Sequence, residues 1–155
     1  MRKIQILREQ VNSNDDIWNE LSNVAIQHFF PTNNDLLDEL SIFVLYFNEM
    51  ESGGHEAVLN WTQERIETFG FNNYLHVLST TLEKIGAPTL ADVERKLAPL
   101  YWSLYHQLEA GEIDEEPFYE VIEQADKAYF ELNEHFRTLV INYFLSIYEQ
   151  VFEIV

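Results

Sequence analysis

The fold is decided most clearly by residues 36–54, which read LLDELSIFVLYFNEMESGG. Leucine, valine and aromatic residues recur along this stretch at helical spacing, which predicts a helix that buries one side. The pair Gly53-Gly54 is expected to end that helix, because glycine readily adopts the left-handed conformation that closes a helix. We expect the helix to begin near Thr32 or Asn33.

The same periodicity continues on both sides of this stretch. Upstream, an apolar helical pattern follows the cap candidates Asn14 and Asp15 and stops at Pro31; its positions are Ile17, Leu21, Val24 and His28. Downstream, a shorter helical pattern with Val58, Trp61 and Arg65 reaches Gly70, after which Asn72 or Asn73 is expected to cap the next helix.

Two further breaks organise the second half of the chain. Gly86-Ala87-Pro88 predicts the end of one helix and the start of another, with Thr89 as its N-cap. Pro99 lies inside this next helix and predicts a kink or a break. Asp114 is expected to open the last segment, which is long enough to require a break near residues 125–128.

These patterns predict a single all-α domain over residues 1–155, with about six or seven helices. No stretch alternates convincingly as a β-strand, and we find no repeat, linker or low-complexity tract. The apolar fraction of 46% excludes an intrinsically disordered chain, even at the high charge described next.

The charge is strongly unbalanced. The 155 residues include 27 Asp and Glu against 9 Lys and Arg, a formal net charge of -18. Direct binding to nucleic acid or to an anionic membrane is disfavoured, because both would repel the protein, whereas a basic protein partner is favoured. The sequence has no targeting signal and no run approaching the roughly 18 apolar residues of a membrane span, so we expect a cytoplasmic protein.

Familiar catalytic and metal-binding patterns are missing from the sequence. There is no cysteine, so disulfides and thiolate metal sites are excluded. None of the five histidines follows a glutamate at the spacing of a di-iron bundle, and His55-Glu56 lacks the second histidine of a zinc-protease helix. We therefore expect no enzymatic activity, no cofactor and no bound metal.

The acids concentrate in the segment between Glu109 and Glu134, which has ten acidic residues against one base, Lys127. Helices stabilised by surface ion pairs interleave lysine with glutamate, and this segment does not. Glu112, Glu116, Glu120 and Glu123 are spaced to form one row along a helix. The partner-facing acidic patch predicted from this segment consists of Glu109, Glu112, Asp114, Glu115, Glu116, Glu120 and Glu123.

Several short motifs resemble a bacterial family that includes a DNA-mimic protein. Residues 48–54 resemble its Asn-Glu-x-x-x-Gly-Gly signature, and residues 82–88 its Ile-Gly-Ala turn. Residues 126–134 and then Tyr143 resemble its C-terminal Asp-x-x-Phe-Tyr-x-Leu helix, so the likeness covers about residues 36–143. Gly53, Gly54, Gly86 and Pro88 are the turn residues of these motifs. The segment after Gly54 departs from the family pattern, because His55 stands where a phenylalanine is usual.

The resemblance implies an all-α, often dimeric protein without enzymatic activity. For the DNA-mimic member it implies binding to a helix-turn-helix transcription regulator in place of DNA. The leading hypothesis is therefore an acidic interaction protein that occupies the basic DNA-binding face of a regulator. Two alternatives stay open: an immunity or antitoxin protein that neutralises a basic toxin, and an enzyme or metal protein with an unrecognised pocket.

Overall fold

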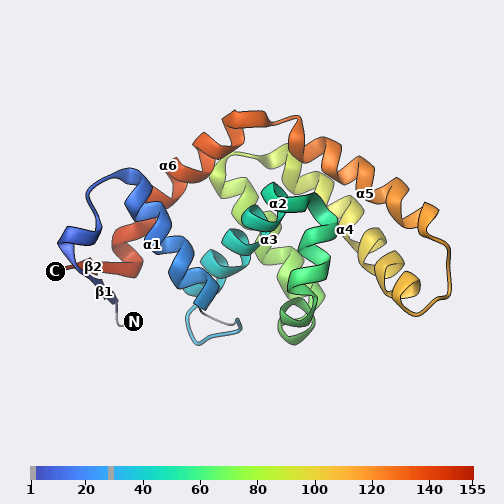
Figure 1. Ribbon diagram of the computed structural model, residues 1–155, viewed down its shortest axis with the longest axis horizontal. Helices are drawn as coiled ribbons and strands as arrows, with labels where there is room; N and C mark the ends of the chain where they lie inside the picture. Colours follow the sequence, from blue (N-terminus) through green and yellow to red (C-terminus); the bar gives the residue numbers. More distant parts are fainter. Residues whose placement is uncertain (1–2, 28–29) are drawn as a thin grey trace.

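The computed structural model describes residues 3–27 and 30–155, and over these residues the protein is all-α (Figure 1). The predicted fold class is confirmed. The helices are α1 (Asn14–Gln27), α2 (Asp35–Phe69), α3 (Phe71–Ile85), α4 (Pro88–Glu109), α5 (Glu115–Phe130) and α6 (Asn133–Val151), with a short 3-10 helix at Arg8–Gln10.

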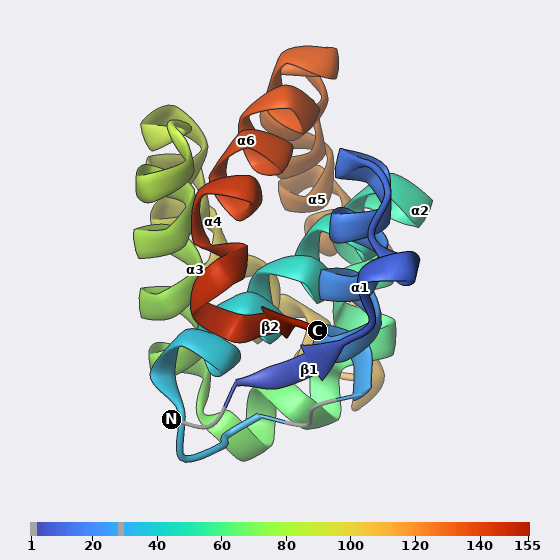
Figure 2. The same ribbon diagram turned by 90° about the vertical axis from the view of Figure 1, so that its left-hand side faces the viewer.

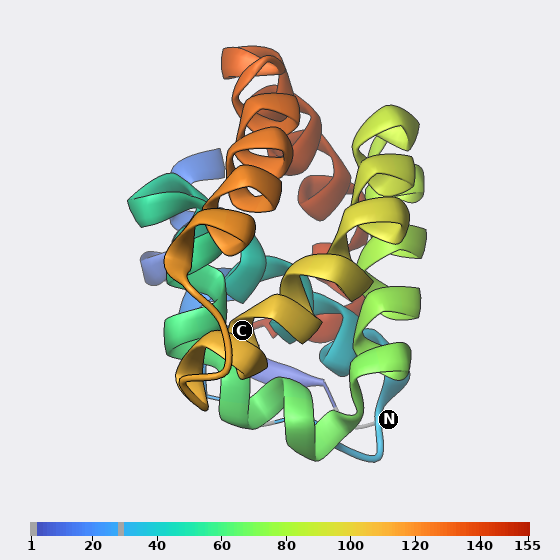
Figure 3. The same ribbon diagram turned by 90° about the vertical axis from the view of Figure 1, so that its right-hand side faces the viewer.

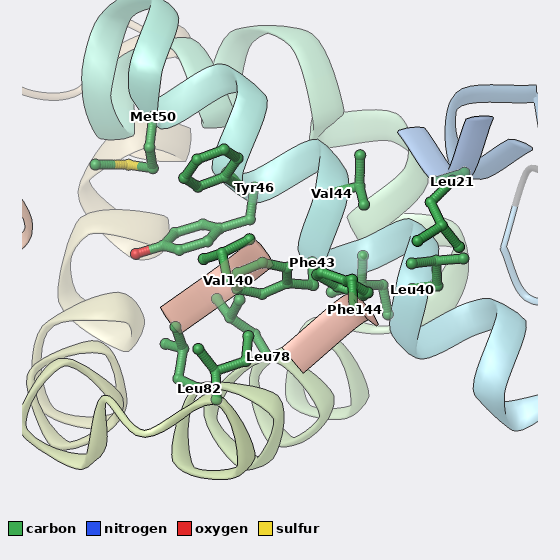
Figure 4. Close-up of a cluster of buried hydrophobic side chains, with 14 of the residues drawn as sticks. Leu21, Leu40, Phe43, Val44, Tyr46, Met50, Leu78, Leu82, Val140 and Phe144 are labelled. Carbon is green, nitrogen blue, oxygen red and sulfur yellow. The ribbon is translucent and has the colours of Figure 1, made fainter. Parts of the chain in front are cut away.

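Helix α2 runs through the middle of the molecule, and its apolar residues carry the larger of two hydrophobic clusters. Side chains of α2 meet those of α1, α3 and α6 in this cluster, as Figure 4 shows for Phe43 of α2, Leu78 and Leu82 of α3 and Phe144 of α6. Phe43 has no exposed surface and its ring lies 5.5 Å from that of Phe144. The stretch that predicted the fold thus forms the centre of the core.

A second, smaller cluster joins α4 and α5 to the part of α2 that follows Gly54. Its buried members are Leu59, Leu97, Ala98, Tyr101, Tyr105, Phe118, Ile122 and Ala125. Burial of this apolar face fixes which side of α5 points inward and leaves the opposite side to solvent.

The two ends of the chain form a small parallel sheet that the sequence analysis did not predict. Strands β1 (Ile4–Ile6) and β2 (Phe152–Ile154) lie side by side (Figure 2). They pair in parallel, with Ile4 opposite Phe152. The expectation of no strand is therefore wrong. A strand of three residues is too short to show an alternating pattern of apolar and polar residues in the sequence. Its pairing also depends on a partner strand at the other end of the chain.

Most predicted helix starts lie within a few residues of the observed ones. Helix α1 begins at Asn14, so the cap candidates Asn14 and Asp15 lie inside its first turn, and the side chain of Ser13 before it accepts the backbone N–H of Asp16 at 3.2 Å. His28 lies outside the described residues. Helix α2 begins at Asp35 rather than at Thr32 or Asn33, because the side chain of Asn34 accepts the backbone N–H of Leu37 at 3.1 Å.

Two further predicted caps are wrong. Helix α3 follows Gly70 directly, so Asn72 and Asn73 lie inside its first turn. Helix α4 begins at Pro88, which makes Ala87 rather than Thr89 the N-cap. Proline fits the first turn of a helix because the N–H it lacks would have no intrahelical partner there.

Two predicted breaks are also wrong. Helix α4 continues through Pro99, so there is no break at this residue, while the alternative of a kink stays a prediction. The last segment breaks at Glu131–Leu132 and not at residues 125–128, since Ala125 and Tyr129 are both buried in the packed face of α5. Asn133 then adopts the left-handed conformation, with φ of 52°.

The predicted turn residues lie where the chain changes direction. Gly86 closes α3 in the left-handed conformation and Pro88 starts α4. Gly53 and Gly54 interrupt the helical backbone of α2 without separating it into two distant helices. Gly54 has φ of 74°, and a β-carbon there would lie 2.8 Å from the Asp126 Oδ1 atom of α5.

Gly54→Ala is expected to lower the free energy of unfolding by much more than Gly111→Ala does. Both glycines have positive φ, but a β-carbon at Gly111 meets no atom within 4 Å. Gly111→Ala should cost about 1 kcal/mol of unfolding free energy for the backbone strain. Gly54→Ala should cost roughly 2 kcal/mol more, because Asp126 must also move. Urea denaturation of both variants checks this, and equal losses would contradict it.

Candidate functional site

The break in α2 delivers His55 into a buried cluster of charged side chains. The imidazole has no exposed surface and lies between Glu94 of α4 and Asp126 of α5. Its Nδ1 atom is 2.7 Å from Asp126 Oδ1, and the backbone N–H of His55 donates to the same oxygen at 2.9 Å. Its Nε2 atom contacts Glu94 Oε1. One residue thus joins three helices.

Glu94 is completely buried, and each of its oxygens accepts a tyrosine hydroxyl. Tyr46 donates to Oε1 at 2.8 Å and Tyr101 donates to Oε2 at 2.7 Å. A buried carboxylate is tolerated when its oxygens are hydrogen-bonded and a cation lies beside it. Both conditions are met at Glu94, so this acid belongs to the interior and not to the acidic surface.

The geometry favours a protonated His55. Both ring nitrogens face carboxylate oxygens, and only the imidazolium has a proton to donate from each nitrogen. Burial opposes this charge, but Glu94 and Asp126 outweigh it and raise the pKa of His55 to about 9. Burial likewise opposes the Glu94 charge, yet His55 and the two tyrosine hydroxyls lower the pKa of that carboxyl below its usual value.

This cluster is suited to holding helices together. His55 and Glu94 expose no surface to a substrate, and only Asp126 is in partial contact with solvent, with 29% of its side chain exposed. Within residues 3–27 and 30–155, no group of three or more His, Asp or Glu side chains is arranged to hold a metal ion. The cluster connects α2, α4 and α5 and fixes how α5 lies on the molecule.

Sequence reasoning did not find this cluster. In the sequence, His55 belongs only to an incomplete zinc-protease pattern and to the segment that departs from the family pattern, and Glu94 belongs to no motif. A signal for Glu94 exists, because it occupies an inward position of α4 among Leu90, Ala91 and Leu97, where an apolar residue is expected. An acid in such a position predicts a buried cationic or hydroxyl partner, although not which one.

All seven residues of the predicted acidic patch are exposed. Glu109 is the last residue of α4, and Glu112 and Asp114 lie in the turn that follows. Glu115 and Glu116 are in the first turn of α5, while Glu120 and Glu123 lie farther along it. None of the seven forms an ion pair with another residue of the described chain.

The structure modifies the predicted row of four acids. Glu112 precedes α5, so only Glu116, Glu120 and Glu123 share the exposed side of this helix, opposite the buried Phe118 and Ile122. Helix α5 lies at the outside of the molecule, against α4 (Figure 3). The helical part of the acidic patch therefore faces outward as one row, and Glu112 lies in the turn before this helix.

Comparisons of the sequence with models of known protein families, with curated proteins and with solved structures give no match. Within the described residues, no helix combines the length and apolar character needed to cross a membrane.

The buried cluster predicts how stability depends on pH. A raised pKa in the folded protein means that the His55 contribution is complete below its ordinary value near 6.5 and is lost as pH rises through about 9. Each pKa unit corresponds to about 1.4 kcal/mol, so the loss in unfolding free energy is on the order of 3 kcal/mol. The lowered pKa of Glu94 gives a contribution that is present above 4.5 and lost as pH falls.

Urea denaturation between pH 5 and pH 10 measures this dependence. His106→Gln is the control, because His106 is a partly exposed histidine paired with Glu67, and its pKa is also raised. In the His106→Gln variant, the free energy of unfolding should still fall as pH rises toward 9, by most of the amount seen in the native protein. A native protein whose stability rises or stays level over that range would contradict the imidazolium assignment.

Proposed function

We propose that this protein is a cytoplasmic, non-enzymatic interaction protein that uses its acidic patch to occupy the DNA-binding face of a basic partner, a helix-turn-helix transcription regulator. The observation that carries the proposal is the set of seven exposed carboxylates at the end of α4, in the following turn and on α5, without ion-pair partners in the described chain. Unpaired like charges repel one another and cost stability, so their retention on one segment favours a binding role.

The spacing of the acids supports competition with DNA. Glu116 and Glu120 are four residues apart on α5, which places them about 6 Å apart along the helix axis. Duplex DNA presents one phosphate charge per roughly 1.7 Å of its axis. The α5 row with the acids of the preceding turn offers a basic surface a comparable, though sparser, line of negative charge.

The family resemblance supports the proposal at the level of the fold. Two of its motifs meet in space, since Gly54 of the glycine pair lies against Asp126 of the C-terminal helix motif. The contact between these motif residues holds α5 against α2, which is a structural reason for the two motifs to occur in one chain. A shared fold does not by itself specify a partner, so the acidic patch carries the functional part of the proposal.

The experiment captures partners from a bacterial lysate on immobilised protein and elutes them with duplex DNA. Basic DNA-binding proteins are the expected captures, with binding that weakens as salt rises, because opposed charges are screened within roughly 8 Å at physiological ionic strength. Capture of a basic nuclease-type toxin would instead support the immunity alternative. Capture of only neutral or acidic proteins would contradict both.

Charge reversal of Glu116, Glu120 and Glu123 to lysine should slow association with the captured partner by about tenfold or more, since electrostatic steering acts mainly on the association rate. The matched control reverses Glu9, Glu64 and Glu149, three exposed acids on other elements, and changes the net charge equally. Surface plasmon resonance compares the two triple variants, with folding checked by circular dichroism. Equal association rates would show that α5 is an ordinary solvated surface.

A further inference from the structure

A cavity of about 700 Å³ lies at the junction of α5 and α6, away from the acidic patch. This volume falls within the range of roughly 300 to 1,000 Å³ that is typical of small-molecule sites. The residues that line it and carry charge or aromatic surface are Glu51, Tyr129, Phe130, Glu134 and Arg137.

The cavity is lined by side chains of opposite charge that form no ion pairs with one another. Arg137 follows Glu134 by three residues on α6, a spacing at which ion pairs form readily. Yet Arg137 forms no ion pair with any described residue, although the protein has 27 acids against 9 bases. Glu51 and Glu134 are also unpaired within the described chain. Positive and negative groups are thus available separately in one cavity.

The start of α6 adds donors on the side of Arg137. Leu132 is the N-cap residue and provides no side-chain hydrogen bond, so the first backbone N–H groups of α6 have no cap. These groups carry the positive end of the helix dipole. Asn133, the first residue of α6, has φ of 52° and turns the chain between α5 and α6.

Aromatic surface completes the cavity. Phe130 is 47% exposed and supplies apolar surface to the cavity. Tyr129 is only 3% exposed, and its hydroxyl has no hydrogen-bond partner among the described residues. Burial and then the nearby Glu51 carboxylate raise the pKa of this hydroxyl, so it stays neutral. The cavity therefore combines an apolar wall with an unsatisfied buried polar group.

We infer that this cavity binds a zwitterionic small molecule about the size of a dipeptide, with an apolar side chain. Its carboxylate is held by Arg137, and its ammonium group by Glu51 and Glu134. The apolar side chain covers Phe130. A simple anion is disfavoured by the two glutamates, and a simple cation by Arg137. This inference is independent of the function proposed for the acidic patch.

Isothermal titration calorimetry with the dipeptide leucyl-phenylalanine tests the inference. The zwitterionic peptide should bind at millimolar concentration or below. Its N-acetylated form, which is only anionic, and its C-terminal amide, which is only cationic, should each bind about tenfold or more weakly, because a charge-assisted hydrogen bond is lost. Equal affinity for the three forms, or saturable binding by none of them, would overturn the inference.

Two variants locate the site. Arg137→Gln removes the group proposed to hold the carboxylate and should weaken binding of the zwitterion by about tenfold or more. Lys96→Gln removes the same charge from an exposed position of α4 and should leave the affinity within about twofold. Unchanged binding in Arg137→Gln would place the peptide elsewhere and overturn the proposed site.

Discussion

The buried imidazole of His55, held between two carboxylates, is the interaction on which the rest of the structure depends. Its partners come from α4 and α5, which approach the same residue from two directions. A buried charge without a partner is costly, so loss of either carboxylate leaves the ring or the other acid uncompensated. The break in α2 at Gly54 belongs to the same arrangement. Only a residue without a β-carbon at this position lets the Asp126 carboxylate reach the backbone N–H of His55.

This arrangement separates two populations of acids. Glu94 and Asp126 both contact the His55 imidazole, Glu94 also accepts two tyrosine hydroxyls, and the two acids organise the interior. The acids of the patch have no such partners, and α5 carries them outward because Asp126 and the apolar residues of the same helix are fixed on the inside. One face of α5 packs against the rest of the molecule, and the other face has the proposed binding role. Both therefore depend on how this single helix docks.

The elements that sequence predicts well are those encoded by neighbouring residues. The apolar periodicity of residues 36–54 and the turns at Gly54, Gly86 and Pro88 are local, and the helices follow from them. The pairing of β1 with β2 joins opposite ends of the chain, and His55 meets partners 39 and 71 residues away. No local pattern specifies such contacts. The exposure of the acidic patch was predictable from the apolar face of α5, whereas the exact end of α5 depended on the buried packing of Ala125 and Tyr129.

The protonation state of His55 at neutral pH tests the central claim most directly. Nitrogen-15 NMR of the imidazole ring distinguishes an imidazolium, with both nitrogens protonated, from a neutral ring with one protonated nitrogen. The structure predicts that both His55 nitrogens are protonated at pH 7, because each faces a carboxylate oxygen. A neutral His55 at pH 7 would contradict the account, since the ring would then present a lone pair to one of the two acids that hold the helices together.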